Sequence, residues 1–501
     1  MPDRNVLLVT LDQLAARAIN GDLAALAPTP NFDRLKAEGV NFLNHRTVTV
    51  PCGPARASLL TGLYAMNHRA IRNGTPLARH HATVATEARK AGYEPLLFGY
   101  SDVTPDPTTV DPEDPDLSVY EGVAPGFREL CEMRMEAGLE WPAYLRAQGY
   151  DFTHSYKGGL PTHQRPVTPE GQAPRPSDPA PYAAAHSDTA YLTDRTLEAL
   201  DIRRGTGWFA HLTYFRPHPT LIAPAPWNTV VAPADVPAPD TRVPDHPFIH
   251  AYFSGPSAGG LWWCYAGDPR DIPASEVAEL RAVYLGLLAE VDHHLGRVMD
   301  WLEASGEAAR TLLIVTADHG EMLGEKGMWG KQTVFSEAYH VPLIVRGPGV
   351  EAAGHSTDLP TESVDLTPTI LDWIGRRPSP AMDGVSLGPV FSGDTPGGWR
   401  KDHLCEVDFG EPHKETRFMR ALGLSADQSG AMLLRDANWS YVHFGGAVPP
   451  MLFDLSDDPG ETRNVAGQAA YGDAERKMAQ RLLTRIAERR DRRMTSYSFG
   501  T

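Results

Sequence analysis

The segment Asn5-Val-Leu-Leu-Val-Thr-Leu11 is a nearly continuous apolar run that leads directly into Asp12-Gln13. Such a run, without polar alternation, is typical of a strand buried on both faces of a parallel sheet. Comparable runs lie at residues 93–98, 208–214, 311–316 and 341–345, and helical patterns lie between them, notably at residues 83–91, 188–200 and 275–302. The alternation predicts an α/β fold with a mostly parallel central sheet flanked by helices.

Several of the predicted strands lead into residues with functional side chains. The pairs and runs concerned are Asp12-Gln13, Tyr100-Ser101, Phe215-Arg216-Pro217-His218 and Asp318-His319. In open α/β sheets, functional groups collect just beyond the carboxyl ends of the strands. The two aspartates, Gln13 and His319 offer oxygen atoms and one imidazole, which suit Ca²⁺, Mn²⁺ or Mg²⁺ better than zinc in a thiolate site. We therefore expect a divalent metal site at this edge of the sheet.

The chain has 501 residues, more than the length at which a single hydrophobic core usually stops growing. We predict two domains, an α/β catalytic domain at residues 1–375 and a smaller α+β domain at residues 376–501. The boundary lies between a helical pattern at residues 364–374 and a segment rich in glycine and proline at residues 376–398. Beyond it lie strand patterns at residues 439–444 and 451–455 and a charged helical pattern at residues 474–489.

Composition and charge argue against several classes of protein. The four cysteines are far apart and show no C-x-x-C spacing, so neither a disulfide framework nor a structural zinc site is indicated. The first apolar run is too short for a signal peptide, and no run approaches membrane-spanning length. We therefore expect a cytoplasmic protein. The net charge of −17 argues against binding to nucleic acid or to an anionic membrane. If the substrate is an anion, the positive potential that attracts it must come from a metal ion and a few cationic side chains at the site itself.

The most specific motif is Cys52-Gly53-Pro54-Ala55-Arg56. A lone cysteine before a turn proline is commonly a buried core residue, so this motif alone assigns no function. Six others accompany it in order: N-V-L-L-V-T-L-D-Q from Asn5, T-P-N-F-D-R-L from Thr29, R-P-H-P from Arg216, D-H-G-E from Asp318, D-L-T-P-T-I-L-D-W-I-G from Asp365 and L-F-D-L-S-D-D-P-G-E-T from Leu452. Together the seven resemble the sulfatase branch of the alkaline phosphatase superfamily, and most closely its phosphonate monoester hydrolases and their arylsulfatase relatives.

This resemblance implies an alkaline phosphatase-like fold with a modified nucleophile. A formylglycine-generating enzyme, acting as a transient partner, would oxidise Cys52 to formylglycine, an aldehyde that hydrates to a geminal diol. One hydroxyl of the diol would be the nucleophile. The resemblance also implies one divalent ion, with Mn²⁺ or Ca²⁺ ahead of Mg²⁺ and Zn²⁺. Its ligands would be Asp12, Gln13, Asp318, His319 and residue 52.

The resemblance assigns the other residues of the site as well. Arg56, one helical turn after residue 52, would orient the diol. His218 and Lys331 would bind oxygens of the transferred group and protonate the leaving oxygen, while Asn73 and Tyr100 would complete the pocket. The implied reaction is hydrolysis of sulfate monoesters, phosphonate monoesters or both, with further activity on phosphate diesters, by a homo-oligomer of two or four chains.

Other functions stay open from the residues alone. A phosphatase or mutase of the same superfamily would use serine or threonine with two metal ions, whereas this chain has Cys52 and no evident second ligand set. A catalytically silent binding protein on the same fold is another alternative, although every expected polar position is filled. The chain also has Tyr100-Ser101-Asp102 where the phosphonate hydrolases carry Tyr-Thr-Thr. The extra carboxylate bears on the preference between sulfate and phosphonate esters.

Overall fold

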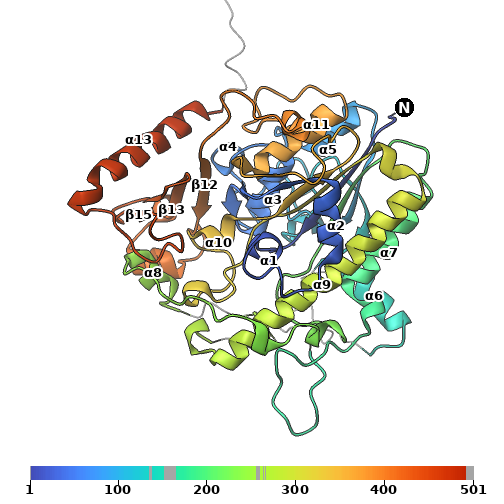
Figure 1. The fold of residues 1–501 in the computed structure, drawn as a ribbon, viewed down its shortest axis with the longest axis horizontal. Coiled ribbons are helices and arrows are strands. Elements are labelled where there is room, and N and C mark those ends of the chain that lie inside the picture. Colours follow the sequence, from blue (N-terminus) through green and yellow to red (C-terminus); the bar gives the residue numbers. More distant parts are fainter. Residues whose placement is uncertain are drawn as a thin grey trace, which may run out of the picture.

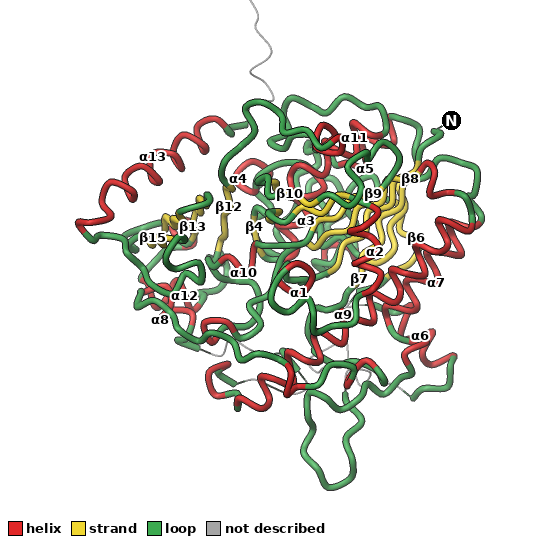
Figure 2. Tube along the Cα trace, in the orientation of Figure 1, coloured by secondary structure: helices red, strands yellow, loops and turns green. Residues whose placement is uncertain are grey.

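A large central sheet covered by helices and a smaller second sheet make up the protein, seen here as a computed structural model (Figure 1). The structure describes residues 2–134, 138–151, 165–255, 260–262, 265 and 267–491. Figure 2 shows the strands of the smaller sheet lying to one side of the larger one. None of the described helices is both long enough and apolar enough to cross a membrane.

The central sheet has eight strands within the described residues. In spatial order they are β10 (Ser356–Thr357), β2 (Val40–Phe42), β9 (Leu343–Arg346), β8 (Thr311–Ala317), β1 (Asn5–Leu11), β7 (Phe209–Tyr214), β5 (Pro95–Gly99) and β6 (Arg128–Glu132). The sheet is mostly parallel, which confirms the predicted fold class. The exception is β9, which corresponds to the predicted strand at residues 341–345 and runs antiparallel to both β2 and β8.

Helices cover both faces of the central sheet and pack on the smaller sheet as well. They are α1 (Arg17–Asn20), α2 (Pro30–Glu38), α3 (Cys52–Thr61), α4 (Ala65–His68), α5 (Val84–Lys90), α6 (Glu140–Ala147), α7 (Asp188–Asp201), α8 (Pro247–Tyr252), α9 (Ala274–Ala304), α10 (Ser336–Tyr339), α11 (Leu366–Trp373), α12 (Arg417–Leu422) and α13 (Gly472–Glu488). Successive side chains of a strand point to opposite faces. On β1, Leu7 and Val9 join a core with α2, α7 and α9, whereas Val6 and Leu8 join a core with α3, α5 and α11.

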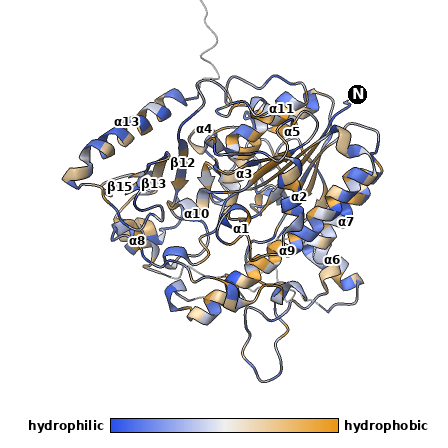
Figure 3. Ribbon diagram, viewed as in Figure 1, coloured by the Kyte–Doolittle hydropathy of each residue, from blue (hydrophilic) through white to orange (hydrophobic). Residues whose placement is uncertain are grey.

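Pairing of β1 with its two neighbours brings three strand ends together. Leu11, the last residue of β1, pairs with Tyr214 of β7 and with Ala317 of β8. The next residue along each strand is therefore at the same edge, and β1 and β8 lead directly into Asp12 and Asp318. Every residue of these three strands is buried, and Figure 3 shows the apolar character of the sheet.

The smaller sheet combines residues from both ends of the chain. Its order is β15 (Met451–Asp454), β14 (Trp439–Phe444), β13 (Gly430–Arg435), β12 (His403–Asp408) and β4 (Thr49–Val50). The first four strands are antiparallel, and β4 pairs in parallel with β12. Helix α13 packs on one face through Met478 and Leu482, while α8 and α12 pack on the other through Phe248 and Phe418. A further parallel pair joins β3 (His45–Arg46) to β11 (Thr361–Glu362).

Strand β4 leads almost directly into Cys52, so the smaller sheet borders the segment Cys52-Gly53-Pro54-Ala55-Arg56. This contact could not be read from the sequence, because β4 is two residues long and its partner β12 lies far along the chain. The division into domains at residues 1–375 and 376–501 remains a prediction.

Candidate active site

Helix α3 presents Cys52 at its first residue. All ten residues of this helix are buried, and its third residue is Pro54, which costs no helical hydrogen bond because the first N–H groups of a helix have no partner within it. The backbone N–H of Gly53 donates to Asn73 Oδ1 at 2.9 Å. A Cβ atom at position 53 would lie 3.1 Å from Asn73 Oδ1 and 3.1 Å from the Asp102 carbonyl oxygen. The motif therefore carries glycine where the chain packs tightly behind the cysteine.

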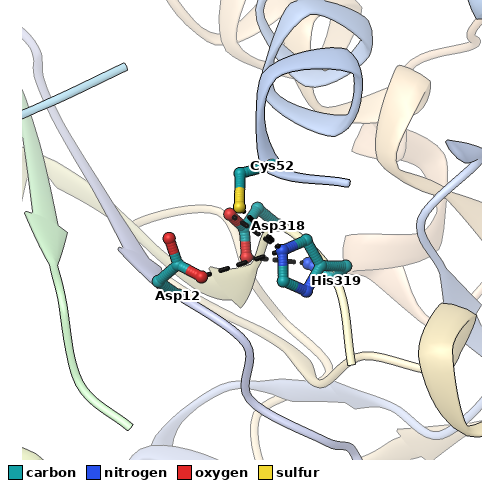
Figure 4. Close-up of side chains that lie close together, drawn as sticks. All are labelled: Asp12, Cys52, Asp318 and His319. Atoms are coloured by element: carbon teal, nitrogen blue, oxygen red, sulfur yellow. Dashed lines mark hydrogen bonds and ion pairs between the residues drawn. The ribbon is translucent and has the colours of Figure 1, made fainter. Parts of the chain in front are cut away.

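Four buried side chains converge on one point (Figure 4). They are Asp12, Cys52, Asp318 and His319, and one ligand atom from each lies within 4.8 Å of all the others. His319 Nε2 is 3.2 Å from Cys52 Sγ and 3.7 Å from a carboxylate oxygen of each aspartate. Asp12 Oδ1 has no hydrogen-bond partner among the described residues. Two facing carboxylates, an imidazole and an unpaired buried oxygen fit a divalent cation.

Arg56 balances the charge of the two aspartates. Its Nε donates to Asp318 Oδ2 at 2.9 Å, and its Nη2 donates to Asp12 Oδ2 at 3.0 Å. A buried guanidinium requires such counter-charges, because an unpaired charge away from water is very costly. The sequence predicted that Arg56 would orient the diol at residue 52. The structure places its hydrogen bonds on the carboxylates and on the Tyr100 carbonyl oxygen.

Tyr100 lies behind Asp12. Its hydroxyl group donates to Asp12 Oδ2 at 2.5 Å, and Arg56 stacks over its ring, with the guanidinium carbon 4.3 Å from the ring centre. The side chain is buried and is not part of the cavity wall described below, although the sequence predicted it in the pocket. Tyr100 thus fixes Asp12 from behind.

Gln13 has a side chain held at both ends. Its Oε1 accepts a hydrogen bond from Lys331 Nζ at 2.5 Å, and its Nε2 donates to Glu321. Glu321 also accepts from the backbone N–H groups of Leu323 and Gly330, at 3.0 and 2.7 Å. The sequence analysis gave Glu321 no role, although the D-H-G-E motif contains it. The structure shows that this carboxylate orients the amide of Gln13 and ties down the loop that leads to Lys331.

Lys331 and His218 are in direct contact, with Lys331 Nζ 2.9 Å from His218 Nε2. The other ring nitrogen of His218, Nδ1, faces the carbonyl oxygen of Pro219, so the proton of the neutral ring is on Nδ1. Nε2 is then the acceptor and the lysine ammonium is the donor. Burial, followed by the charge of Lys331, lowers the pKa of His218 to about 4, in agreement with this tautomer.

The protein groups around Cys52 favour the neutral form of its thiol. Burial, followed by repulsion from Asp12, raises the pKa of Cys52 well above its ordinary value. Nucleophilic cysteines need the opposite shift, because the thiolate is the reactive form.

Asp102 adds a third carboxyl group to this region. Its Oδ2 is 3.5 Å from Arg56 Nε, and its Oδ1 has no hydrogen-bond partner among the described residues. Burial raises the pKa of Asp102 well above its ordinary value.

A cavity of about 990 Å³ leads to the site. Gln13, Asn73, His218 and Lys331 are in its wall. Other wall residues come from the end of β12 and the region after it, among them Asp408, Phe409, Gly410, Glu411, Thr416, Arg417 and Phe418. Arg72 links the N-terminal and C-terminal groups of wall residues, because its Nη1 donates to the Gly410 carbonyl oxygen at 3.2 Å. The sequence analysis did not predict this contribution from the C-terminal part, and no motif in it signals one.

Comparison with known proteins identifies the family. The family model described as Sulfatase matches residues 4–376, and the model described as N-sulphoglucosamine sulphohydrolase, C-terminal, matches residues 324–488. The chain is 37% identical over 515 residues to the multifunctional alkaline phosphatase superfamily protein PehA of Trinickia caryophylli, covering 99% of this chain and 98% of that protein.

Two solved structures are similar over nearly the whole chain. The phosphonate monoester hydrolase SpPMH from Silicibacter pomeroyi is 43% identical with a TM-score of 0.94, and the phosphonate monoester hydrolase of Agrobacterium radiobacter is 35% identical with a TM-score of 0.92. Each comparison covers 99% of this chain and 98% of the other. Fold, site and matches together define a hydrolase of the alkaline phosphatase superfamily. Within that superfamily, the chain belongs to the sulfatase family, which confirms the resemblance seen in the sequence.

Proposed function

We propose that this protein is a metal-dependent formylglycine hydrolase that cleaves phosphonate monoesters and sulfate monoesters, with further activity on phosphate diesters. The observation that carries the proposal is the convergence of Cys52 with Asp12, Asp318 and His319 at the carboxyl edge of the sheet. The similarity to two phosphonate monoester hydrolases favours phosphonate esters as the better substrates.

Asp12, Asp318, His319 and residue 52 would hold the metal ion. Gln13 Oε1 now accepts a hydrogen bond from Lys331, and it would become a further ligand when that hydrogen bond breaks. When bound, a divalent ion stabilises negative charge on the sulfuryl or phosphonyl oxygens and lowers the pKa of a coordinated hydroxyl group. Formylglycine at position 52, as its hydrate, would supply one hydroxyl group for attack, and deprotonation of the other would re-form the aldehyde and release the sulfate or phosphonate.

The residues of the chain have separate tasks in this proposal. Arg56 keeps both carboxylates charged and oriented, since a guanidinium is a permanent cation with donors in a fixed fork. Asn73 holds the backbone of Gly53 and so fixes the start of α3. Lys331, which reaches both Gln13 and Cys52, donates to the leaving oxygen, while His218 holds the ammonium in place.

A panel of esters with a common leaving group tests the substrate class. We expect turnover of aryl phosphonate monoesters and aryl sulfates by protein coexpressed with a formylglycine-generating enzyme, with a lower rate for aryl phosphate diesters. Turnover confined to phosphate monoesters, with two bound metal ions, would instead indicate a phosphatase. No turnover of any ester by fully modified, metal-loaded protein would indicate a binding protein.

Lys331→Ala is expected to act mainly on esters with poor leaving groups. Since an alkoxide or phenoxide of high pKa needs a proton when it departs, loss of the donor should lower kcat/KM for these esters about 100-fold or more, and for nitrophenyl esters far less. The measurement is kcat/KM across phenyl esters of graded leaving-group pKa. His218→Ala should show a smaller effect of the same kind, because the ammonium remains.

Lys36→Ala is the matched control, since Lys36 is a partly buried lysine on α2, outside the site, that bonds Asp33 and the Ile19 carbonyl oxygen. Parallel plots for the parent protein and both site variants would contradict the assignment and leave Lys331 and His218 as groups that only bind charge.

A further inference from the structure

Arg216 is a buried cation that lies behind the cavity wall. It follows β7 and is 3% exposed. Its Nε is 2.8 Å from Asp188 Oδ2, at the first residue of α7, and the Asp188 side chain is equally buried. The wall residues His218, Pro219 and Thr220 follow Arg216 in the chain, separated from it only by Pro217. The ion pair therefore connects a helix of the main domain to the segment that carries His218.

The guanidinium of Arg216 bonds the backbone of that segment at two points. Its Nη1 donates to the Thr220 carbonyl oxygen at 2.8 Å and approaches the His218 carbonyl oxygen at 3.4 Å. The ring of His218 belongs to the same segment, with Nδ1 on the Pro219 carbonyl oxygen and Nε2 on Lys331. Movement of the guanidinium would therefore shift the backbone that sets the direction of the ring.

A contribution to folding stability does not by itself explain why Arg216 and Asp188 form a buried ion pair. Replacing a buried ion pair by well-packed apolar side chains often leaves stability unchanged or raises it. A guanidinium differs from an apolar side chain in its rigid fork of five donors, which can specify the positions of several acceptors at once. At this place the acceptors are one carboxylate and two carbonyl oxygens of the His218 segment.

Two other titratable groups face the pair. Tyr182 Oη is 3.5 Å from Arg216 Nη2. Glu290 on α9 is completely buried, and burial, followed by repulsion from Asp188, raises its pKa to about 8. Asp188, which contacts Arg216 directly, is therefore the main counter-charge of Arg216.

We propose that Arg216, anchored by Asp188, is a positioning residue that holds His218 in contact with Lys331. The inference rests on the proposed role of His218 and Lys331 at the leaving oxygen. Arg216 contacts the wall residues only through the backbone carbonyl oxygens of His218 and Thr220, and its ion pair is with Asp188 rather than with a carboxylate of the metal site. Its effect on the reaction passes through His218 alone.

The test is a double-mutant cycle between Arg216→Met and His218→Ala, read across the phenyl ester series. Arg216→Met should lower kcat/KM for esters of high leaving-group pKa about 10- to 100-fold, since small displacements of catalytic groups have effects of this size. Nitrophenyl esters should be much less affected. In the His218→Ala background, the same change should cost less than about threefold, because residues that act as one unit are not additive.

Two further variants keep the test decisive. Asp188→Asn removes the anchor while keeping the shape of the side chain, and should show the same pattern if Arg216→Met fails to fold. Arg216→Lys keeps the positive charge but not the planar arrangement of five donors. It should recover at most part of the kcat/KM that Arg216→Met loses. Arg400→Met is the matched control, because Arg400 is an ion-paired arginine near the smaller sheet whose side chain is only 5% exposed and is bonded to Asp365. It should leave the leaving-group dependence unchanged.

The outcomes separate the two proposals. Equal losses from Arg216→Met with and without His218 would overturn the positioning role and show a general structural effect. A steeper leaving-group dependence in His218→Ala, but not in Arg216→Met or Asp188→Asn, would overturn this inference and leave the proposed function standing. An unchanged dependence in His218→Ala itself would overturn the role of His218, and the positioning role with it.

Discussion

Cys52→Ala is expected to lower kcat/KM by about 10⁴- to 10⁶-fold for every ester that the protein cleaves, the range seen when a catalytic nucleophile is removed. The change deletes the atom from which the nucleophile is made, and it leaves the carboxylates, Arg56 and Lys331 in place. Binding and electrostatic stabilisation would account for the residual rate. The measurement is steady-state turnover of nitrophenyl esters, with peptide mass spectrometry of residue 52 in the parent protein.

Cys131→Ala is the matched control for loss of a buried thiol. Cys131 lies in β6 at the edge of the central sheet, away from the site. Its replacement should lower Tm without changing kcat/KM by more than about threefold. Mass spectrometry that shows only cysteine at position 52 in fully active protein would contradict the formylglycine proposal. A thiolate would then be the nucleophile, and the burial that raises the pKa of Cys52 would predict activity that increases with pH.

Asp318→Asn is expected to reduce affinity for the divalent ion by about 100-fold or more, and turnover with it. Altering residues that only support metal ligands already costs about 10- to 100-fold, so loss of a charged ligand should cost at least as much. The amide also leaves Arg56 with one counter-charge fewer. Two measurements are needed: metal content by elemental analysis, and the rise in Tm on adding Mn²⁺ or Ca²⁺, since a ligand that binds more tightly stabilises the fold more at the same concentration.

Asp292→Asn provides the control for removal of a buried carboxylate elsewhere. Asp292 accepts hydrogen bonds from the backbone N–H groups of Asn31 and Phe32 at the start of α2. Its replacement should lower Tm and leave the metal content at one ion per chain. Full metal content and unchanged turnover in Asp318→Asn would rule out Asp318 as a ligand. Two equivalents of tightly bound zinc in the parent protein would favour the phosphatase alternative.

The positions of Asp12 and Asp318 were predictable because each follows a long apolar strand. Parallel strands with buried faces end at the same edge, and the register of Leu11 with Ala317 places the two aspartates together. The direction of β9 was not predictable in this way. An apolar run has the same composition whichever way the strand runs, and only its pairing with β8 shows that it is antiparallel.

The partners of individual side chains were less accessible to sequence reasoning. The motif gave the correct spacing of Cys52 and Arg56 on one helix, but the direction of the guanidinium depends on counter-charges contributed by β1 and β8. Glu321 was visible in its motif without a function, since its partners are backbone N–H groups and the amide of Gln13. The contact between Lys331 and His218 joins residues more than a hundred positions apart.

Local patterns along the chain thus suffice for the fold class, the family and the types of side chain at the site. These properties depend on neighbouring residues: apolar runs, strand ends and short motifs. Tertiary structure alone decides that the region after β12 completes the cavity, that Arg56 bonds carboxylates, and that Arg216 and Asp188 support the segment of His218. Each of these contacts joins segments distant in sequence, and a buried charge takes as its partner whichever opposite charge or carbonyl oxygen the packed core brings within reach.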